Sequence, residues 1–157
     1  MLATQRRMNF HPAIRHAPDP EHPGWSTWDV TGPTRFNNAI GKLLVRRSED
    51  GRGWCRMFPA QEHSNLGQKV HGGALMTFID MALYAGGAMA GANVAQAVTL
   101  DCSVQFLSPG ELGVPLDAEL ELLSETRRLV FVRGRVLQGE RLVASFSACL
   151  RKAVLAR

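Results

Sequence analysis

The sequence has few residues of the kinds that build disulfide frameworks or metal centres. Its 157 residues include three cysteines, Cys55, Cys102 and Cys149, which are widely spaced and form no Cys-x-x-Cys pair. An odd number of scattered cysteines argues against a disulfide scaffold and indicates reduced, half-buried thiols in a cytoplasmic protein. None of the five histidines lies at metal-ligand spacing from another: they are His11, His16, His22, His63 and His71. We therefore expect no metal site.

Several other signatures are absent as well. The chain has no glycine-rich phosphate loop, no serine nucleophile elbow and no strand–helix–strand repeat typical of nucleotide-binding sheets. No apolar stretch follows the arginine pair in residues 1–10, so we expect no secretory signal. Lysine occurs only at positions 42, 69 and 152, and the net charge of +4 comes from scattered arginines. This pattern disfavours nucleic-acid binding and suits a small phosphate-bearing anion.

The length and composition predict one globular domain with an irregular arm before it. The chain is 45% hydrophobic and 20% charged, which is ordinary for a folded domain. Residues 1–33 are proline-rich with little periodicity, and we expect Trp25 and Trp28 to pin part of this arm onto the domain surface. We expect the domain to span residues 34–157, beginning with a short helix over 34–41 whose N-cap is Thr34.

Alternating apolar and polar residues predict an antiparallel sheet covered on one face. In residues 99–107, for example, Leu100 and Phe106 share the apolar face, while Thr99 and Asp101 share the polar one. An Asp-Gly turn at 50–51 favours a hairpin between the first two strands. The six predicted strands are 40–47, 53–58, 99–107, 114–122, 129–137 and 142–150.

The segment 72–92 is almost wholly apolar, with Asp80 as its only charge. About 20 apolar residues are enough to span a membrane, but five glycines and a central acid argue against a span here. A helix that is apolar all round, flanked by half-apolar strands, is better placed at the centre of a curved sheet. We therefore predict an α+β fold in which one long helix is wrapped by six antiparallel strands.

Asp80 and the turn before this helix are the candidate site. A carboxylate in an apolar setting is costly unless it is paired, so Asp80 suggests a function. His71-Gly72-Gly73 lies where the helix begins, and unpaired amides at a helix N-terminus can stabilise an oxyanion. Nine residues, about two and a half turns, separate His71 from Asp80. One helix therefore cannot present both to one small group, which hints at a site shared between two chains.

Three sequence segments form a pattern when they are taken in order. The first is Asn-x5-His-Gly-Gly at 65–73, followed by Asp80 in the apolar helix. The second is 97–113, a strand that ends in a Ser-Pro step before a glycine, and the third is the Thr-Arg-Arg turn at 126–128. In this order the segments resemble the PaaI-type hotdog-fold acyl-CoA thioesterases, with Thr126 in place of the family's usual glycine. The resemblance covers roughly residues 36–150 and implies a hotdog fold that forms dimers and often tetramers.

The resemblance also implies catalytic roles. Asp80 would be the general base or nucleophile that attacks the thioester carbonyl. The Gly72 amide of the partner subunit would hold the carbonyl oxygen, and Asn65 would orient the reacting groups. His71 would position the turn, and Thr99 would help to orient a water molecule.

The substrate follows from the same resemblance. Gly73 would lie against the thioester, and Arg127 and Arg128 would contact the phosphates of coenzyme A. No cofactor is expected, because coenzyme A is part of the substrate and a thiolate leaves readily. Two alternatives stay open: a hotdog-type acyl-CoA hydratase or dehydratase, and a non-catalytic acyl-CoA-binding module.

Overall fold

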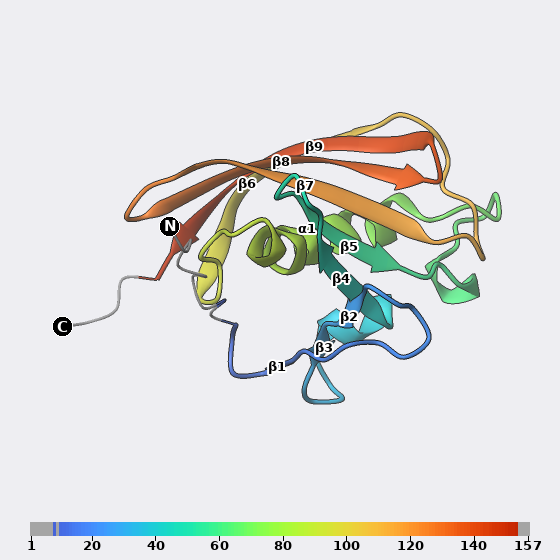
Figure 1. The fold of residues 1–157 in the computed structure, drawn as a ribbon. Helices are drawn as coiled ribbons and strands as arrows, with labels where there is room; N and C mark the ends of the chain where they lie inside the picture. Colours follow the sequence, from blue (N-terminus) through green and yellow to red (C-terminus); the bar gives the residue numbers. More distant parts are fainter. Residues whose placement is uncertain (1–7, 9, 154–157) are drawn as a thin grey trace.

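The computed structural model describes residue 8 and residues 10–153, so parts of the predicted arm (1–7 and 9) and of the predicted domain (154–157) lie outside the described residues. One long helix, α1 (Gly72–Met89), packs against a curved antiparallel sheet (Figure 1). The sheet has the order β2-β4-β5-β7-β8-β9-β6. Its strands are β2 (Ser26–Thr27), β4 (Leu43–Arg47), β5 (Gly53–Met57), β6 (Ala97–Phe106), β7 (Leu116–Glu125), β8 (Leu129–Gln138) and β9 (Arg141–Lys152). The predicted α+β architecture is confirmed, and the arm adds β2 as a seventh, two-residue strand.

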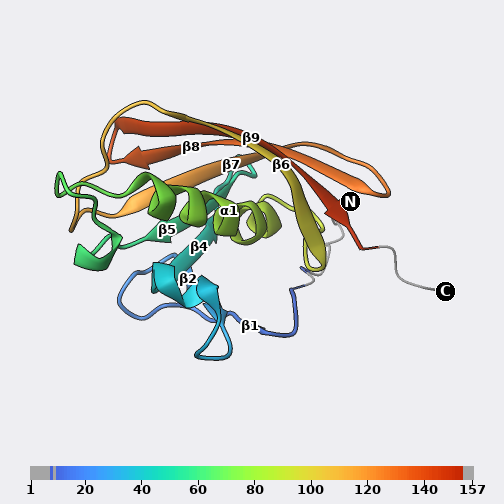
Figure 2. The same cartoon turned by 180° about the vertical axis from the view of Figure 1, so that it is seen from behind.

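Small residues let the sheet approach α1 closely. A Cβ built on Gly53 of β5 would lie 1.7 Å from the carbonyl oxygen of Gly86, and one on Gly86 would lie 2.4 Å from the Leu120 side chain. Strand β5 therefore touches the helix backbone directly. At the same, C-terminal end of α1, the Arg47 guanidinium donates a 2.6 Å hydrogen bond to the carbonyl of Met89, where the helix dipole favours a cation. These contacts hold α1 against the sheet. The ribbon views show the helix on the concave face of the sheet (Figure 1 and Figure 2).

The structure corrects three local expectations. Residues 36–40 form a 3₁₀ helix, η1 (Phe36–Ile40), whose N-cap is Arg35 without a side-chain bond, so Thr34 is not the cap. Strand β7 begins at Leu116, because Pro115 has no amide to donate to a ladder. A bulge in β6 between Thr99 and Asp101 breaks the simple alternation.

This bulge changes the face of one candidate site residue. It leaves Leu100 exposed at 55% and turns Thr99 toward α1, so the prediction that Thr99 shares the polar face of the strand with Asp101 is wrong. Phe106, predicted on the covered face, is also 56% exposed. Among the described strands, β6 pairs only with β9 and forms one edge of the sheet.

The described part of the arm lies across the sheet edge beside β4. Strand β2 pairs with β4, and a separate two-stranded ribbon joins β1 (Ile14–Arg15) to β3 (Asp29–Val30). Trp25 and Trp28 are buried; the Arg46 guanidinium lies 4.5 Å from the Trp25 ring centre. The tryptophans thus anchor the arm, as the sequence predicted.

Candidate functional site

The N-terminus of α1 carries the His-Gly-Gly turn. His71 is the N-cap, and its Nδ1 accepts a 2.8 Å hydrogen bond from the Gly73 amide. The neutral ring therefore carries its proton on Nε2, and the side chain serves to close the first helical turn. The Gly72 amide has no hydrogen-bond partner within the described chain. All three residues are exposed, so this amide is open to a ligand.

The loop before the helix (65–69) is folded around Asn65. Its Oδ1 accepts hydrogen bonds from the amides of Gly67 and Lys69, at 2.9 and 3.1 Å. The adjacent Gln68 has φ 56°, a left-handed conformation that this loop imposes. The oxygen of the Asn65 side chain is thus used in the fold, and its amide nitrogen remains as a donor that can face outward.

Asp80 lies in the middle of α1, on the face that the sheet leaves uncovered. It is exposed together with Gly73 and Met76, so in the single chain the apolar sequence around it does not bury the carboxylate. Residues spaced three or four apart share one helix face, and the sheet covers the opposite one. The carboxylate is therefore accessible from solvent in the single chain.

Two side chains hold this carboxylate in place. The hydroxyl of Thr99 donates a 2.8 Å hydrogen bond to Oδ1 of Asp80. The hydroxyl of Tyr84 lies 3.0 Å from Thr99 Oγ1 and is able to donate to it. Burial raises the pKa of Tyr84, which keeps this phenol protonated. The result is a chain of hydrogen bonds from Tyr84 through Thr99 to the carboxylate.

Tyr84 was not among the residues expected from the sequence. Its position four residues after Asp80 on the same helix is the signal that could have found it, because such residues lie side by side.

The sequence also gave no role for His63. It is buried, with Nε2 2.8 Å from the Ala39 carbonyl and Nδ1 accepting from the Ala60 amide, which makes it a structural residue of η2 (Gln61–His63).

The turn at 126–128 lies at the far end of β7 and β8. Thr126 Oγ1 accepts hydrogen bonds from the amides of Arg128 and Leu129, so this hydroxyl organises the turn. The side chains of Arg127 and Arg128 are exposed, and neither forms an ion pair with another described residue. Both cations are available to an anionic ligand.

A metal has little place in this arrangement. Within residues 8 and 10–153, one group of potential ligands is close enough, Asp19, Glu21 and His22. The Lys42 ammonium already lies 2.6 Å from Asp19 Oδ2, where a cation would otherwise bind. The same hydrogen bond, with that from His22, lowers the pKa of Asp19 to about 2. No described helix has the length and hydropathy that crossing a membrane requires.

Comparison with known protein families gives a match that covers most of the candidate site residues. Residues 67–145, which include Asp80, Thr99 and both arginines, match the family model of the Thioesterase superfamily. The chain belongs to the thioesterase superfamily. Human "Acyl-coenzyme A thioesterase 13" is 26% identical over 106 residues, covering 65% of this chain and 72% of that protein. The family and this relative identify the chain as a thioester hydrolase.

Solved structures support the same assignment. A mutant of the phenylacetic acid degradation protein PaaI from Thermus thermophilus is 25% identical with a TM-score of 0.63, covering 75% of this chain and 98% of that one. A hypothetical thioesterase with coenzyme A from Streptococcus pneumoniae has a TM-score of 0.63 at 20% identity, covering 74% and 89%; it shows the shared fold. The resemblance to PaaI-type hotdog thioesterases is confirmed.

Proposed function

We propose that this thioesterase hydrolyses acyl-CoA or aryl-CoA thioesters in the cytoplasm, with the Asp80 carboxylate as its reacting group. The observation that carries the proposal is the Thr99–Asp80 hydrogen bond at the open face of α1. Because Thr99 occupies Oδ1, the second oxygen, Oδ2, is left to act on substrate or water. The relatives named for acyl-CoA hydrolysis support the substrate class.

The chemistry needs no cofactor. As a general base, the carboxylate takes a proton from water while the hydroxide attacks the thioester carbonyl, and the coenzyme A thiolate leaves and is protonated. As a nucleophile, Oδ2 attacks the carbonyl and expels the thiolate, and water then cleaves the resulting anhydride. Both routes place negative charge on the carbonyl oxygen. Both therefore need a hydrogen-bond donor facing that oxygen.

That donor comes, in our proposal, from a second copy of the chain. Gly72 and Asp80 are eight residues apart on one helix, which is about 12 Å along its axis. A single thioester carbonyl cannot meet both from the same chain. Strand β6 is an edge strand with Val98, Leu100 and Phe106 exposed, and pairing of two such edges would bring two helices together. The Gly72 amide of the partner subunit would then face Asp80.

The remaining candidate residues have supporting roles. Asn65 would use its free amide nitrogen to orient the thioester, and Gly73 would let it approach the helix. Arg127 and Arg128 would bind the phosphates of coenzyme A. The hydratase alternative needs a histidine that is free to move a proton. The bond between His71 Nδ1 and the Gly73 amide argues against that role and in favour of hydrolysis.

The test is release of free thiol from a panel of coenzyme A thioesters with short, medium, long and aromatic acyl groups. Asp80→Asn should lower kcat by about 100-fold or more, because it removes the reacting carboxylate. Asp29→Asn is the matched control, since it neutralises an exposed carboxylate of β3. An Asp80→Asn variant with most of its activity would refute the role of Asp80. A panel with no thiol release would refute the proposed function.

A further inference from the structure

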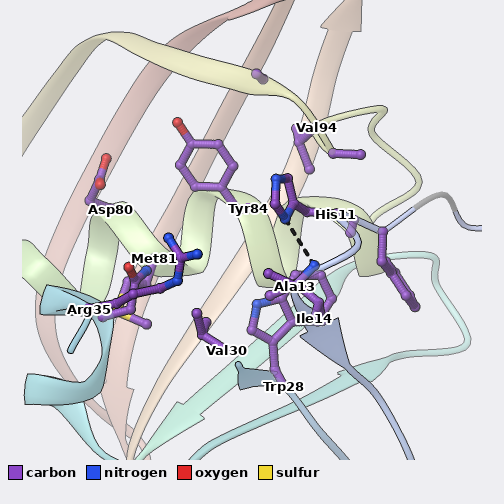
Figure 3. A pocket seen from close by; sticks show the side chains of 15 residues that line it. His11, Ala13, Ile14, Trp28, Val30, Arg35, Asp80, Met81, Tyr84 and Val94 are labelled. Carbon is purple, nitrogen blue, oxygen red and sulfur yellow. Dashed lines mark hydrogen bonds between the residues drawn. The ribbon is translucent and has the colours of Figure 1, made fainter. Parts of the chain in front are cut away.

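The described arm forms one wall of a cavity beside Asp80 (Figure 3). The cavity has a volume of about 280 Å³, and one wall consists of arm residues that include Phe10, Ile14, Trp28 and Val30. Phe10 packs edge-on against Trp28 with ring centres 5.0 Å apart. Ile14 pairs with Val30 across the β1–β3 ribbon. The arm residues that line the cavity are therefore held in place by β1–β3 backbone pairing and by packing of the Phe10 and Trp28 rings.

The opposite wall belongs to α1 and to the start of β6. Met81, Tyr84 and Ala88 contribute from successive turns of the helix, and Ala97 contributes from β6. Asp80 also lines this cavity, so the reacting carboxylate and the apolar walls share one space. In Figure 3 the Val30 and Trp28 side chains lie across the cavity from Asp80 and Tyr84.

Most residues that line the cavity are apolar or aromatic, which suits an apolar occupant. Apart from Asp80 and the side chains of His11, Arg35 and Asn37, which are exposed, the lining consists of apolar or aromatic groups. Cavities of roughly 150 Å³ with apolar walls hold benzene. A space of about 280 Å³ therefore accommodates one aromatic ring with a short linker, or an aliphatic chain of similar volume.

We propose that this cavity between the arm and α1 holds the acyl part of the thioester, and that the arm sets which acyl groups fit. The assignment rests on the proposed function, because the acyl group must lie next to the carboxylate that attacks its carbonyl. The preferred substrate class is an arylalkanoyl or medium-chain acyl thioester. Long-chain acyl groups exceed the cavity, and acetyl groups leave it largely unfilled.

A second hollow also borders Asp80 and gives a competing location. It is lined by Phe36, Met76 and Thr77 and is more open to solvent than the arm cavity. Phe36 is 76% exposed there, so this surface would bury much less of an apolar group. The arm cavity, which is less open to solvent, is therefore the better acyl site.

The experiment changes the arm wall without touching Asp80. Val30 is half-buried, so Val30→Phe should fill part of the cavity and Val30→Ala should enlarge it, with the fold preserved. Arg15→Ala is the control, because Arg15 is an exposed residue of the same ribbon. Each protein is assayed with acetyl-, octanoyl-, phenylacetyl- and palmitoyl-CoA. Binding of free octanoate and phenylacetate is followed by tryptophan fluorescence, since Trp28 lines the cavity.

Val30→Phe should lower kcat/KM for octanoyl- and phenylacetyl-CoA by about tenfold or more, while acetyl-CoA hydrolysis stays within about twofold. It should also weaken binding of the two free acids. If both readouts are the same in Val30→Phe and wild type, the assignment is overturned while hydrolysis stands. If Phe36→Ala changes the acyl preference instead, the second hollow is the acyl site. If no ester is hydrolysed but Val30→Phe weakens acid binding, the cavity assignment stands and the proposed function fails.

Discussion

Replacing Gly72 by proline tests the proposed oxyanion donor, because it removes the amide hydrogen of residue 72. Proline has no amide hydrogen, and although its ring adds bulk, it is favoured at the first position of a helix, which Gly72 occupies. His71 has φ −62° and ψ 136°, the extended conformation that a residue before proline requires. A Cβ at Gly72 would meet only the Phe106 ring, at 3.8 Å, which is ordinary contact. The helix should therefore still begin at residue 72, while the backbone loses one hydrogen-bond donor.

The expected loss is large because the Gly72 amide has no partner within the described chain and is free to serve substrate. Removing one donor from an oxyanion site typically costs about 3 to 4 kcal/mol, which is 100- to 1,000-fold in kcat. Gly72→Ala keeps the amide and should retain kcat within a few fold. Both variants are measured by thiol release under saturating substrate, with thermal unfolding as the check on folding.

Mixing variants tests whether the donor and the carboxylate come from different chains. In a dimer of one Gly72→Pro chain and one Asp80→Asn chain, a shared arrangement leaves one site intact and makes the other doubly defective. Random exchange of subunits should then recover about one quarter of the wild-type sites. A mixture as inactive as its parents would place both groups in one chain. Full activity of Gly72→Pro alone would remove this amide from the mechanism.

Three further predictions concern the hydrogen-bond chain, the core and the arm. Tyr84→Phe should lower kcat by about 2- to 10-fold in the wild type and have no effect in a Thr99→Val background, as a double-mutant cycle would measure, because Tyr84 acts through Thr99. Gly53→Ala should lower the free energy of unfolding in urea by about 3 kcal/mol or more, since its Cβ would overlap the Gly86 carbonyl; an unchanged midpoint would contradict the packing. Asp19 has its pKa lowered from 3.8 to about 2, so its ion pair stabilises the fold above pH 4 and is lost as the pH falls toward 2. Thermal unfolding from pH 2 to 6 should show that Asp19→Asn removes this part of the pH dependence, and identical profiles would refute it.

Much of the fold could be predicted from the period of apolar residues. The six main strands and the central helix follow from alternation and from one continuous apolar run, and their ends differ from the prediction by a few residues. Pro115 explains one of these differences and could have been read from the sequence. The bulge in β6 could not, because nothing local marks it. The bulge turns Thr99 to the opposite face of the strand, so the alternating pattern assigned this residue to the wrong face.

The sequence predicted some residues of the candidate site and missed others. Asp80 stands out because it is the single charge in the apolar run, and the His-Gly-Gly turn stands out because it precedes a helix. Tyr84 and the arm wall were missed, since their relevance depends on what packs opposite them. Phe10 and Trp28 lie more than 50 residues from Asp80 in the chain, and only the folded arm brings them to its cavity. Composition identified the arm and its anchoring tryptophans and gave no indication of the cavity.

The exposure of Asp80 explains how an acid is tolerated in an otherwise apolar helix. The sheet buries Phe78 and Ile79 completely, whereas Asp80 projects from the opposite face into solvent, where a carboxylate costs little. A second copy closing over this face would exclude water and strengthen each hydrogen bond to the carboxylate. The hydroxyl of Thr99 is already in place to satisfy it there. In the proposed dimer, the acid would cost little when one chain folds, and assembly of two chains would bury the carboxylate and bring the Gly72 amide of the partner subunit to the thioester carbonyl.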